Sequence, residues 1–405
     1  MNIDQTKLEA EIGKILDPLM PANSGVGFAA GAVYPNASGG SESCCFYYGE
    51  VADQPANPLS GYRPALRVQS RTAPDEDTLW CIGSCTKTFT AALLGIKAAT
   101  TPSVVQESVV KYIGEFLMKE PVIPMGLQDV TLESLASMSS WMPGDDWFPQ
   151  YLGPGKGKSS YPIADMFANI LDPSIYENHR PEPYFDYSNV AVGVLAYSMV
   201  QLYGRASGDV QALFSELATL MRDELLAPLG MDSAGFWPPN LSSGEYTFPY
   251  GLKNGRQQTG HNPAWPATAG AGALVMTAPD FLTWLQANMG TIESMPLMPL
   301  SPNVRSFLRS DPKTTLRSTG SLWSEGQQIS RCWFYDTFKP AERKDLELTM
   351  INKNGDVPGF VAGLGYLEPG ASDGQATHGA FVMGNTADLQ AREVNQQILA
   401  LLTVG

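Results

Sequence analysis

The sequence has few of the residues from which metal sites and disulfide frameworks are built. It has only three histidines, which are scattered along the chain: His179, His261 and His378. Its five cysteines are Cys44, Cys45, Cys81, Cys85 and Cys332. An odd number with one adjacent pair and no C-x-x-C argues against a disulfide framework and against a zinc site. The histidines suggest neither a His-rich metal site nor a Ser-His-Asp triad. We therefore expect no metal and no cofactor.

Basic residues are also scarce. The chain has 26 Lys and Arg against 41 Asp and Glu, which gives a formal net charge of −15. The basic residues form no run or stripe. Such a balance repels nucleic acid and anionic membrane surfaces. We therefore expect neither as a partner, and the sequence does not indicate the oligomeric state.

Long hydrophobic runs are missing as well. The most apolar stretch, VAVGVLAYSMV from Val190, is too short to span a bilayer. The N-terminus has no basic region followed by an apolar one, as a secretory signal would. Its apolar residues are instead spaced 4, 3, 4, which predicts an amphipathic helix; they are Leu8, Ile12, Ile15 and Leu19. We predict a cytoplasmic protein.

What the chain does have is apolar material for a large core, with 43% hydrophobic and only 17% charged residues over 405 positions. Strand-like runs lie near both ends. Near the N-terminus, the pattern predicts a hairpin of residues 25–35 and 44–51. Near the C-terminus, it predicts four further strands: residues 329–338, 346–353, 360–369 and 378–385. The segments between them are mostly helix-like, and a last helix is expected to carry Ala391, Val394, Ile398 and Leu401 on one face.

This segregation of strands and helices favours an α+β fold. We predict an antiparallel sheet flanked by N- and C-terminal helices, with an inserted, mostly helical domain. Residues 1–83 and 262–405 are assigned to the sheet domain and residues 84–261 to the insertion. A cleft between the two parts is the natural place for a site.

The first candidate motif is S-x-x-K at Ser84 and Lys87. Residues three apart at a helix start share one face, so the lysine amine can approach the serine hydroxyl. The helix N-terminus adds partial positive charge, which stabilises a developing alkoxide. The motif recurs at Ser108 and at Ser310, but only at Ser84 does it follow a strand-like run and open an apolar helix. The alternative is an ordinary surface Ser and Lys.

Two further motifs follow along the chain. Tyr187-Ser188-Asn189 stands just before a helix-like stretch, where a simple helix-start pair is the alternative. Lys353-Asn354-Gly355 follows a strand-like stretch. The same tripeptide at Lys253 looks like an Asn-Gly turn, and a turn is therefore the alternative at Lys353 too.

In this order the three motifs resemble a family that contains class C serine β-lactamases, D-alanyl-D-alanine peptidases, family VIII esterases and related acyltransferases. In that family S-x-x-K, Y-x-N and K-T-G line one cleft. Residues 130–144 and 266–285 are similar to two other stretches of the family, although Met138 stands where His is usual and Trp141 where Gly is usual. The resemblance covers roughly residues 25–400 and implies a β-lactamase/transpeptidase-like fold.

The resemblance implies a role for each motif residue. Ser84 would be the nucleophile that forms an acyl-enzyme, and Lys87 its base. Tyr187 would shuttle the proton to the leaving group, and Asn189 would orient the substrate. Lys353 would hold Tyr187 or Lys87 in a useful protonation state. Backbone N–H groups of Ser84 and of Asp356, directly after Lys353-Asn354-Gly355, would form the oxyanion hole.

Two departures from the family pattern shape the expected substrate. Asn354 replaces the Thr or Ser that usually helps to bind a β-lactam carboxylate, and Asp356 adds a negative charge beside it. With the cytoplasmic prediction, this argues against cell-wall or antibiotic substrates. We predict an esterase or transesterase acting on a small-molecule ester, thioester or amide. The alternatives are a β-lactamase or D-amino-acid peptidase and, less favoured, a non-catalytic member of the fold.

Overall fold

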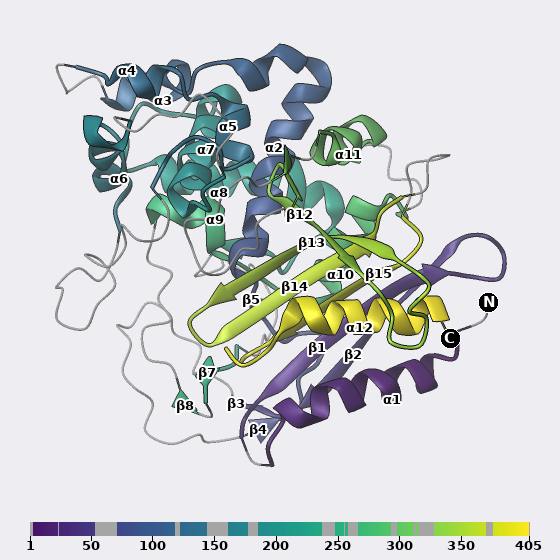
Figure 1. Cartoon of the computed structure of the whole chain (residues 1–405). Coiled ribbons are helices and arrows are strands. Elements are labelled where there is room, and N and C mark those ends of the chain that lie inside the picture. The colour runs from purple at the N-terminus through teal and green to yellow at the C-terminus, as the bar shows by residue number, and fades with distance from the viewer. Residues whose placement is uncertain are drawn as a thin grey trace.

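Strands from the two ends of the chain meet in one antiparallel sheet in the computed structural model of the protein (Figure 1). The structure describes residues 3–22, 24–52, 71–117, 122–143, 161–176, 185–236, 248–254, 256–257, 266–292, 298–311, 313–314, 328–369 and 376–404. Among these residues, eight strands form the sheet in the order β10-β11-β12-β13-β14-β15-β1-β2. The predicted α+β fold is confirmed.

The strands of the sheet come mainly from two chain segments. The N-terminal hairpin and the C-terminal strands are β1 (Gly27–Pro35), β2 (Ser41–Gly49), β10 (Lys313–Thr314), β11 (Gln328–Ser330), β12 (Trp333–Phe338), β13 (Leu348–Val357), β14 (Phe360–Leu367) and β15 (Gly379–Gly384). Strand β1 pairs with β2, the edge strand, on one side and with β15 on the other, so N-terminal and C-terminal strands are neighbours in the sheet. The predicted hairpin over residues 25–51 is confirmed.

Two terminal helices cover one face of this sheet, as Figure 1 shows: α1 (Gln5–Leu16) and α12 (Ala391–Val404). Their buried residues, among them Leu8, Ile12 and Ile398, pack against Phe28 and Val382 of the sheet. The two terminal helices predicted from the spacing of apolar residues are therefore confirmed. The other face packs against α10 (Ala278–Met289), while α2 (Thr86–Thr100) and α11 (Pro302–Arg309) pack against each other.

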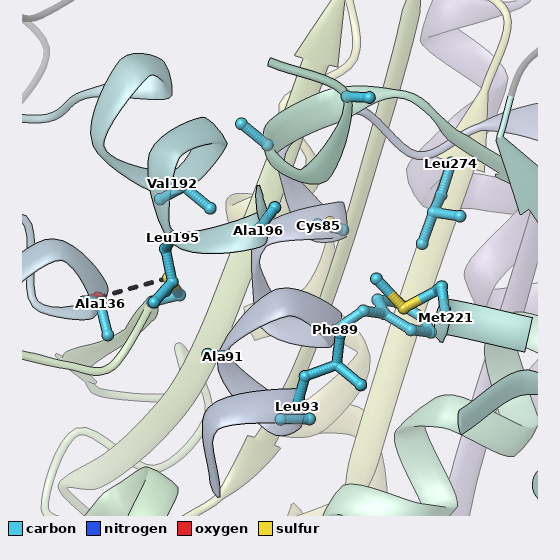
Figure 2. Packing of buried hydrophobic residues seen from close by; sticks show 14 of the residues in the cluster. Cys85, Phe89, Ala91, Leu93, Ala136, Val192, Leu195, Ala196, Met221 and Leu274 are labelled. Carbon is cyan, nitrogen blue, oxygen red and sulfur yellow. Dashed lines mark hydrogen bonds between the residues drawn. The ribbon is translucent and has the colours of Figure 1, made fainter. Parts of the chain in front are cut away.

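The remaining helices gather beyond α2 (Figure 1). They are α3 (Val110–Leu117), α4 (Met125–Gln128), α5 (Leu132–Ala136), α6 (Ile163–Asn169), α7 (Asn189–Leu202), α8 (Leu213–Met221) and α9 (Ala269–Gly272). Helix α7 is apolar all round and is buried from Val190 to Val200, as a helix inside a bundle must be. Figure 2 shows Phe89 and Leu93 of α2 in the same apolar cluster as Leu195 of α7.

Short elements complete the described structure. Two-stranded pairs form between β3 (Val51–Ala52) and β4 (Arg71–Thr72), and between β7 (Leu252–Lys253) and β8 (Arg256–Gln257). Strands β5 (Trp80–Cys81), β9 (Leu274–Met276) and β6 (Gly235–Phe236) form a small sheet. One apolar core runs from the large sheet through α2 into the helical part. The predicted boundaries at residues 83 and 262 therefore stay a prediction.

One predicted strand is wrong in its extent. Residues 329–338 read as a single strand, but the structure divides them into β11 and β12, joined by a two-residue turn at Arg331 and Cys332. Cys332 has a φ of 65°, a left-handed conformation that glycine or asparagine usually supplies in such turns. Because neither residue stands there, the sequence carries no turn signal.

Within the described part of the chain, no helix combines the length and the apolar character that crossing a membrane requires.

A buried carboxylate fixes the start of α10. Asp280, in the first turn of this helix, accepts hydrogen bonds from Ser233 Oγ at 2.6 Å and from the Ser233 backbone N–H at 2.9 Å. Ser233 Oγ also lies 2.9 Å from Thr277 Oγ1. Burial raises the pKa of Asp280, against the opposing effect of the Ser233 hydrogen bonds.

We expect Asp280→Ala to lower the free energy of unfolding by about 1–3 kcal/mol, because it leaves the Ser233 donors buried without an acceptor. Asp280→Asn keeps an acceptor oxygen and should cost less. A carboxyl group whose pKa is raised by folding stabilises the protein below its unfolded pKa of about 4, and that contribution is lost as the pH rises. Urea unfolding across this range should therefore show Asp280→Asn gaining stability relative to the wild type with rising pH. A constant difference would contradict this account.

Candidate active site

Ser84 and Lys87 lie at the start of α2. Ser84 belongs to a short 3-10 turn (Gly83–Cys85) between β5 and α2, and Lys87 is fully buried in the first turn of α2. Lys87 Nζ lies 2.9 Å from Ser84 Oγ, 2.5 Å from Asn189 Oδ1 and 2.8 Å from the carbonyl oxygen of Ala271. Asn189 Oδ1 and the Ala271 carbonyl accept from the amine and hold it beside the hydroxyl, as a base must be held before it can take the proton.

The Tyr187 segment enters this site just before α7. Ser188, not Asn189, caps the helix, because its Oγ accepts from the Ala191 N–H at 2.9 Å. This leaves the Asn189 amide to contact Lys87. The Tyr187 ring centroid lies 4.8 Å from Lys87 Nζ and 5.1 Å from Lys353 Nζ. The phenol therefore stands between two lysine side chains.

Lys353 reaches the same place from the sheet. It is buried in β13, and its Nζ lies 3.4 Å from Tyr187 Oη and 2.9 Å from the carbonyl oxygen of Asn354. Residues 353–355 pair with 362–364 of β14, so the tripeptide is a strand and not a turn. At the other copy of this sequence, Lys253 pairs with Arg256 and Asn254 has a φ of 49°, as in a turn.

The main chain of β13 packs directly on the Ser84 turn. A Cβ atom placed on Gly355 would lie 1.9 Å from Ile82 O and 2.8 Å from the Ser84 backbone nitrogen. A Cβ atom placed on Gly83 would lie 2.8 Å from the Asp356 backbone nitrogen. Only glycine permits this approach at both positions. The Ser84 and Asp356 N–H groups, which are predicted to form the oxyanion hole, therefore lie on two segments that contact each other.

The Asn354 side chain does not join the site. Its Oδ1 lies against Gly363, where a Cβ atom would meet it at 2.6 Å beside Ala391 and Asn395 of α12. Neighbouring residues of a strand point to opposite faces, so Asn354 turns to the face that α12 covers while Lys353 faces Ser84. The structure therefore does not bring the Asn354 side chain together with the other predicted site residues. Only its backbone carbonyl contacts a site residue.

Asp356 is exposed near the end of β13. Although the residue as a whole is exposed, its carboxyl group is partly buried, and this burial raises its pKa. The nearby Lys253 ammonium opposes that effect. Asp356 therefore has two separable contributions, a backbone N–H next to the Ser84 turn and a carboxyl group at the surface.

The other sequence candidates lie elsewhere. Lys111 pairs with Glu107 at 2.6 Å on the surface, and Ser310 Oγ donates to the Phe307 carbonyl. Cys85, next to Ser84, is buried and donates to the Lys353 carbonyl, and burial raises the pKa of its thiol to about 12. A thiol so hard to ionise packs rather than attacks. Among the described residues, no three His, Cys, Asp or Glu side chains gather as metal ligands would.

The sequence missed two parts of the site. The Ala271 carbonyl that contacts Lys87 belongs to a stretch that the family resemblance does single out, but a backbone acceptor leaves no mark in a residue pattern. The second is the support of Tyr187 by residues 137–143. The Asp186 N–H donates to the Met138 carbonyl at 2.9 Å, and Ser188 Oγ donates to the Pro143 carbonyl at 2.6 Å.

Solved structures with the same fold cover nearly the whole chain. A class C beta-lactamase superposes with a TM-score of 0.68 at 16% identity, covering 100% of this chain and 98% of its own. A D-alanine carboxypeptidase from Burkholderia cenocepacia gives a TM-score of 0.66 at 20% identity, covering 98% of this chain and 100% of its own. At these identities the likeness shows the fold alone.

Two sequence comparisons go further. A curated relative, the unguisins hydrolase ungD' of Aspergillus campestris, is 24% identical over 243 residues, which is 58% of this chain. The match spans only 42% of that protein's length. The family model described as Beta-lactamase matches residues 55–362, most of the chain. The chain therefore belongs to the beta-lactamase family of serine hydrolases.

Proposed function

We propose that the protein is an esterase or transesterase that forms an acyl-enzyme on Ser84 and acts on a small-molecule ester, thioester or amide. The observation that carries the proposal is the buried Lys87 amine, 2.9 Å from the Ser84 hydroxyl. A serine hydroxyl is a weak nucleophile until a neighbouring base removes its proton. We assign this role to Lys87.

The remaining residues have roles in the steps that follow. Ser84 Oγ attacks the substrate carbonyl carbon as its proton passes to Lys87. The resulting oxyanion accepts hydrogen bonds from the Ser84 and Asp356 N–H groups, each worth about 3–4 kcal/mol in comparable sites. Tyr187 delivers a proton to the leaving group and later takes one from water or an alcohol. The Lys353 ammonium, 3.4 Å away, stabilises negative charge on the phenol.

The second candidate is a β-lactamase or D-amino-acid peptidase, which the named activities of the structural relatives favour. Against it stands the Asn354 side chain, which is turned to α12 and so offers no hydroxyl to a substrate carboxylate. Asp356 adds to the formal net charge of −15, which disfavours an anionic substrate at long range. A neutral ester suits this surface better.

The experiment that separates them is a comparison of activated esters and thioesters with nitrocefin, with and without an added alcohol, on wild type and Ser84→Ala. We expect ester turnover that falls at least about a thousandfold in Ser84→Ala, and little nitrocefin turnover. Faster cleavage with the alcohol, together with its ester product, would assign a transesterase. Nitrocefin turnover that exceeds ester turnover and disappears in Ser84→Ala would instead assign the β-lactamase activity.

A further inference from the structure

A buried arginine in the turn between β11 and β12 joins three elements. Arg331 is 7% exposed, and its Nε donates to Glu133 Oε2 of α5 at 2.9 Å. Its Nη1 donates to the carbonyl oxygens of Phe307 and Ser310, at 2.5 and 2.9 Å, where α11 ends. The guanidinium also lies 4.0 Å from the Phe307 ring centroid. Arg331 therefore connects the sheet to α11 and to α5.

The next residue adds a second connection to α5. The Cys332 backbone N–H donates to the Ala136 carbonyl at 3.0 Å, and its left-handed φ of 65° turns it toward that helix. Helix α5 thus contacts the loop between β11 and β12 near both of its ends, through Glu133 and Ala136. Two contacts on one short helix fix its orientation as well as its position.

From α5 the connection continues to Tyr187. The chain leaves Ala136 directly into residues 137–143, which hold the tyrosine segment through the Met138 and Pro143 carbonyls. Those two hydrogen bonds come from Asp186 and Ser188, the residues on either side of Tyr187. A shift of α5 is therefore transmitted to the phenol.

From the same turn a second path leads to Lys353. Strand β12 begins directly after Cys332, and its Phe334 pairs with Asn352, the neighbour of Lys353 in β13. Lys353 Nζ lies 5.0 Å from the Phe334 ring centroid. The two paths that start at Arg331 therefore end on the two partners of the 3.4 Å contact between Lys353 Nζ and Tyr187 Oη.

We infer that Arg331 and Glu133 are positioning residues that set the spacing of the Lys353 ammonium and the Tyr187 phenol. This inference rests on the proposed function, because it assumes that Tyr187 takes part in proton transfer. The side chains of the pair are only 9% and 12% exposed. Removing one charge leaves the other buried without its counter-ion, unlike the loss of a surface pair.

The test is a double-mutant cycle between Glu133→Gln and Tyr187→Phe in the full chain, read as the second-order rate constant (kcat/KM) for cleavage of an alkyl ester, whose alcohol needs a proton to leave. We expect Glu133→Gln to lower this rate about tenfold when Tyr187 is present, because small misplacements of reacting groups are costly. In the Tyr187→Phe background its effect should be less than about twofold, since the group it positions is gone.

Asp280→Ala is the matched control, because it also removes a buried carboxylate hydrogen bond but lies on neither path. At a temperature where all variants are folded, its rate constant for the same ester should lie within about twofold of the wild-type value. If Glu133→Gln does not fold, Arg331→Lys replaces it, since lysine keeps the charge but lacks the guanidinium fork that reaches Glu133 and α11 together.

Equal losses in both backgrounds, or no loss in either, would overturn the inference and leave Arg331 and Glu133 as stabilising residues only. A wild type that cleaves no ester, or a Tyr187→Phe variant that cleaves the alkyl ester as fast as the wild type, would count against the proposed function instead. The two failures are therefore distinguishable.

Discussion

Replacing Lys87 with alanine should lower the rate of Ser84 acylation by about a thousandfold or more. Lys87 Nζ lies 2.9 Å from the hydroxyl, and general-base catalysis typically contributes a factor of about 10² to 10⁴. The measurement is the rate of probe labelling or ester turnover under conditions where circular dichroism shows the variant folded. The buried side chain makes the fold control necessary.

Lys97 offers a matched control on the same helix. Its ammonium lies 3.8 Å from the Tyr203 ring centroid and touches no site residue among the contacts described above. Lys97→Ala removes the same charge from α2 and should leave labelling within about twofold of wild type. If Lys87→Ala retained more than a tenth of the wild-type rate, Lys87 would not be the base.

The second large effect is expected at Gly355. Its replacement by alanine places a methyl group 1.9 Å from Ile82 O and 2.8 Å from the Ser84 nitrogen, so the Ser84 turn and β13 must separate. Loss of a single oxyanion-hole donor lowers rates by about 10² to 10³. We expect a loss of that size in ester turnover, and a decrease of about 1–3 kcal/mol in the free energy of unfolding from overpacking.

Gly114 in α3 tests whether any glycine would behave this way. A Cβ atom there would meet only Val110 Cγ1, at an ordinary 3.6 Å. Gly114→Ala should therefore stabilise the protein by about 0.5–1 kcal/mol and leave turnover unchanged. Full activity in Gly355→Ala would show that the contact between β13 and the Ser84 turn is not part of catalysis.

The fold follows from the sequence where periodicity and burial agree. The terminal helices and the hairpin of β1 and β2 are predicted correctly, because an apolar face or an apolar run fixes each of them. The division of residues 329–338 is not predictable, since Cys332 adopts a left-handed turn without Gly or Asn. Trp141, at the position where the family has glycine, likewise has a φ of 56°. There the backbone conformation is one that glycine adopts easily, although the residue is not glycine.

For the site, the motifs identify the residues that converge but not the direction of every side chain. Ser84, Lys87, Tyr187, Asn189 and Lys353 lie together in one connected set of contacts. The Asn354 side chain points away, because a tripeptide pattern does not say which face of a strand each residue occupies. The ion pair of Arg331 and Glu133 is invisible to the sequence, since it joins residues 198 positions apart.

The most direct measurement is intact-mass spectrometry, followed by peptide mapping, after treatment with a fluorophosphonate. A hydroxyl that has a lysine amine, a phenol and two backbone donors around it should react alone among the serines of the chain. The prediction is one adduct per molecule, located on Ser84 and missing in Ser84→Ala. A folded protein that stays unmodified, or that carries its adduct on another serine, would contradict the account.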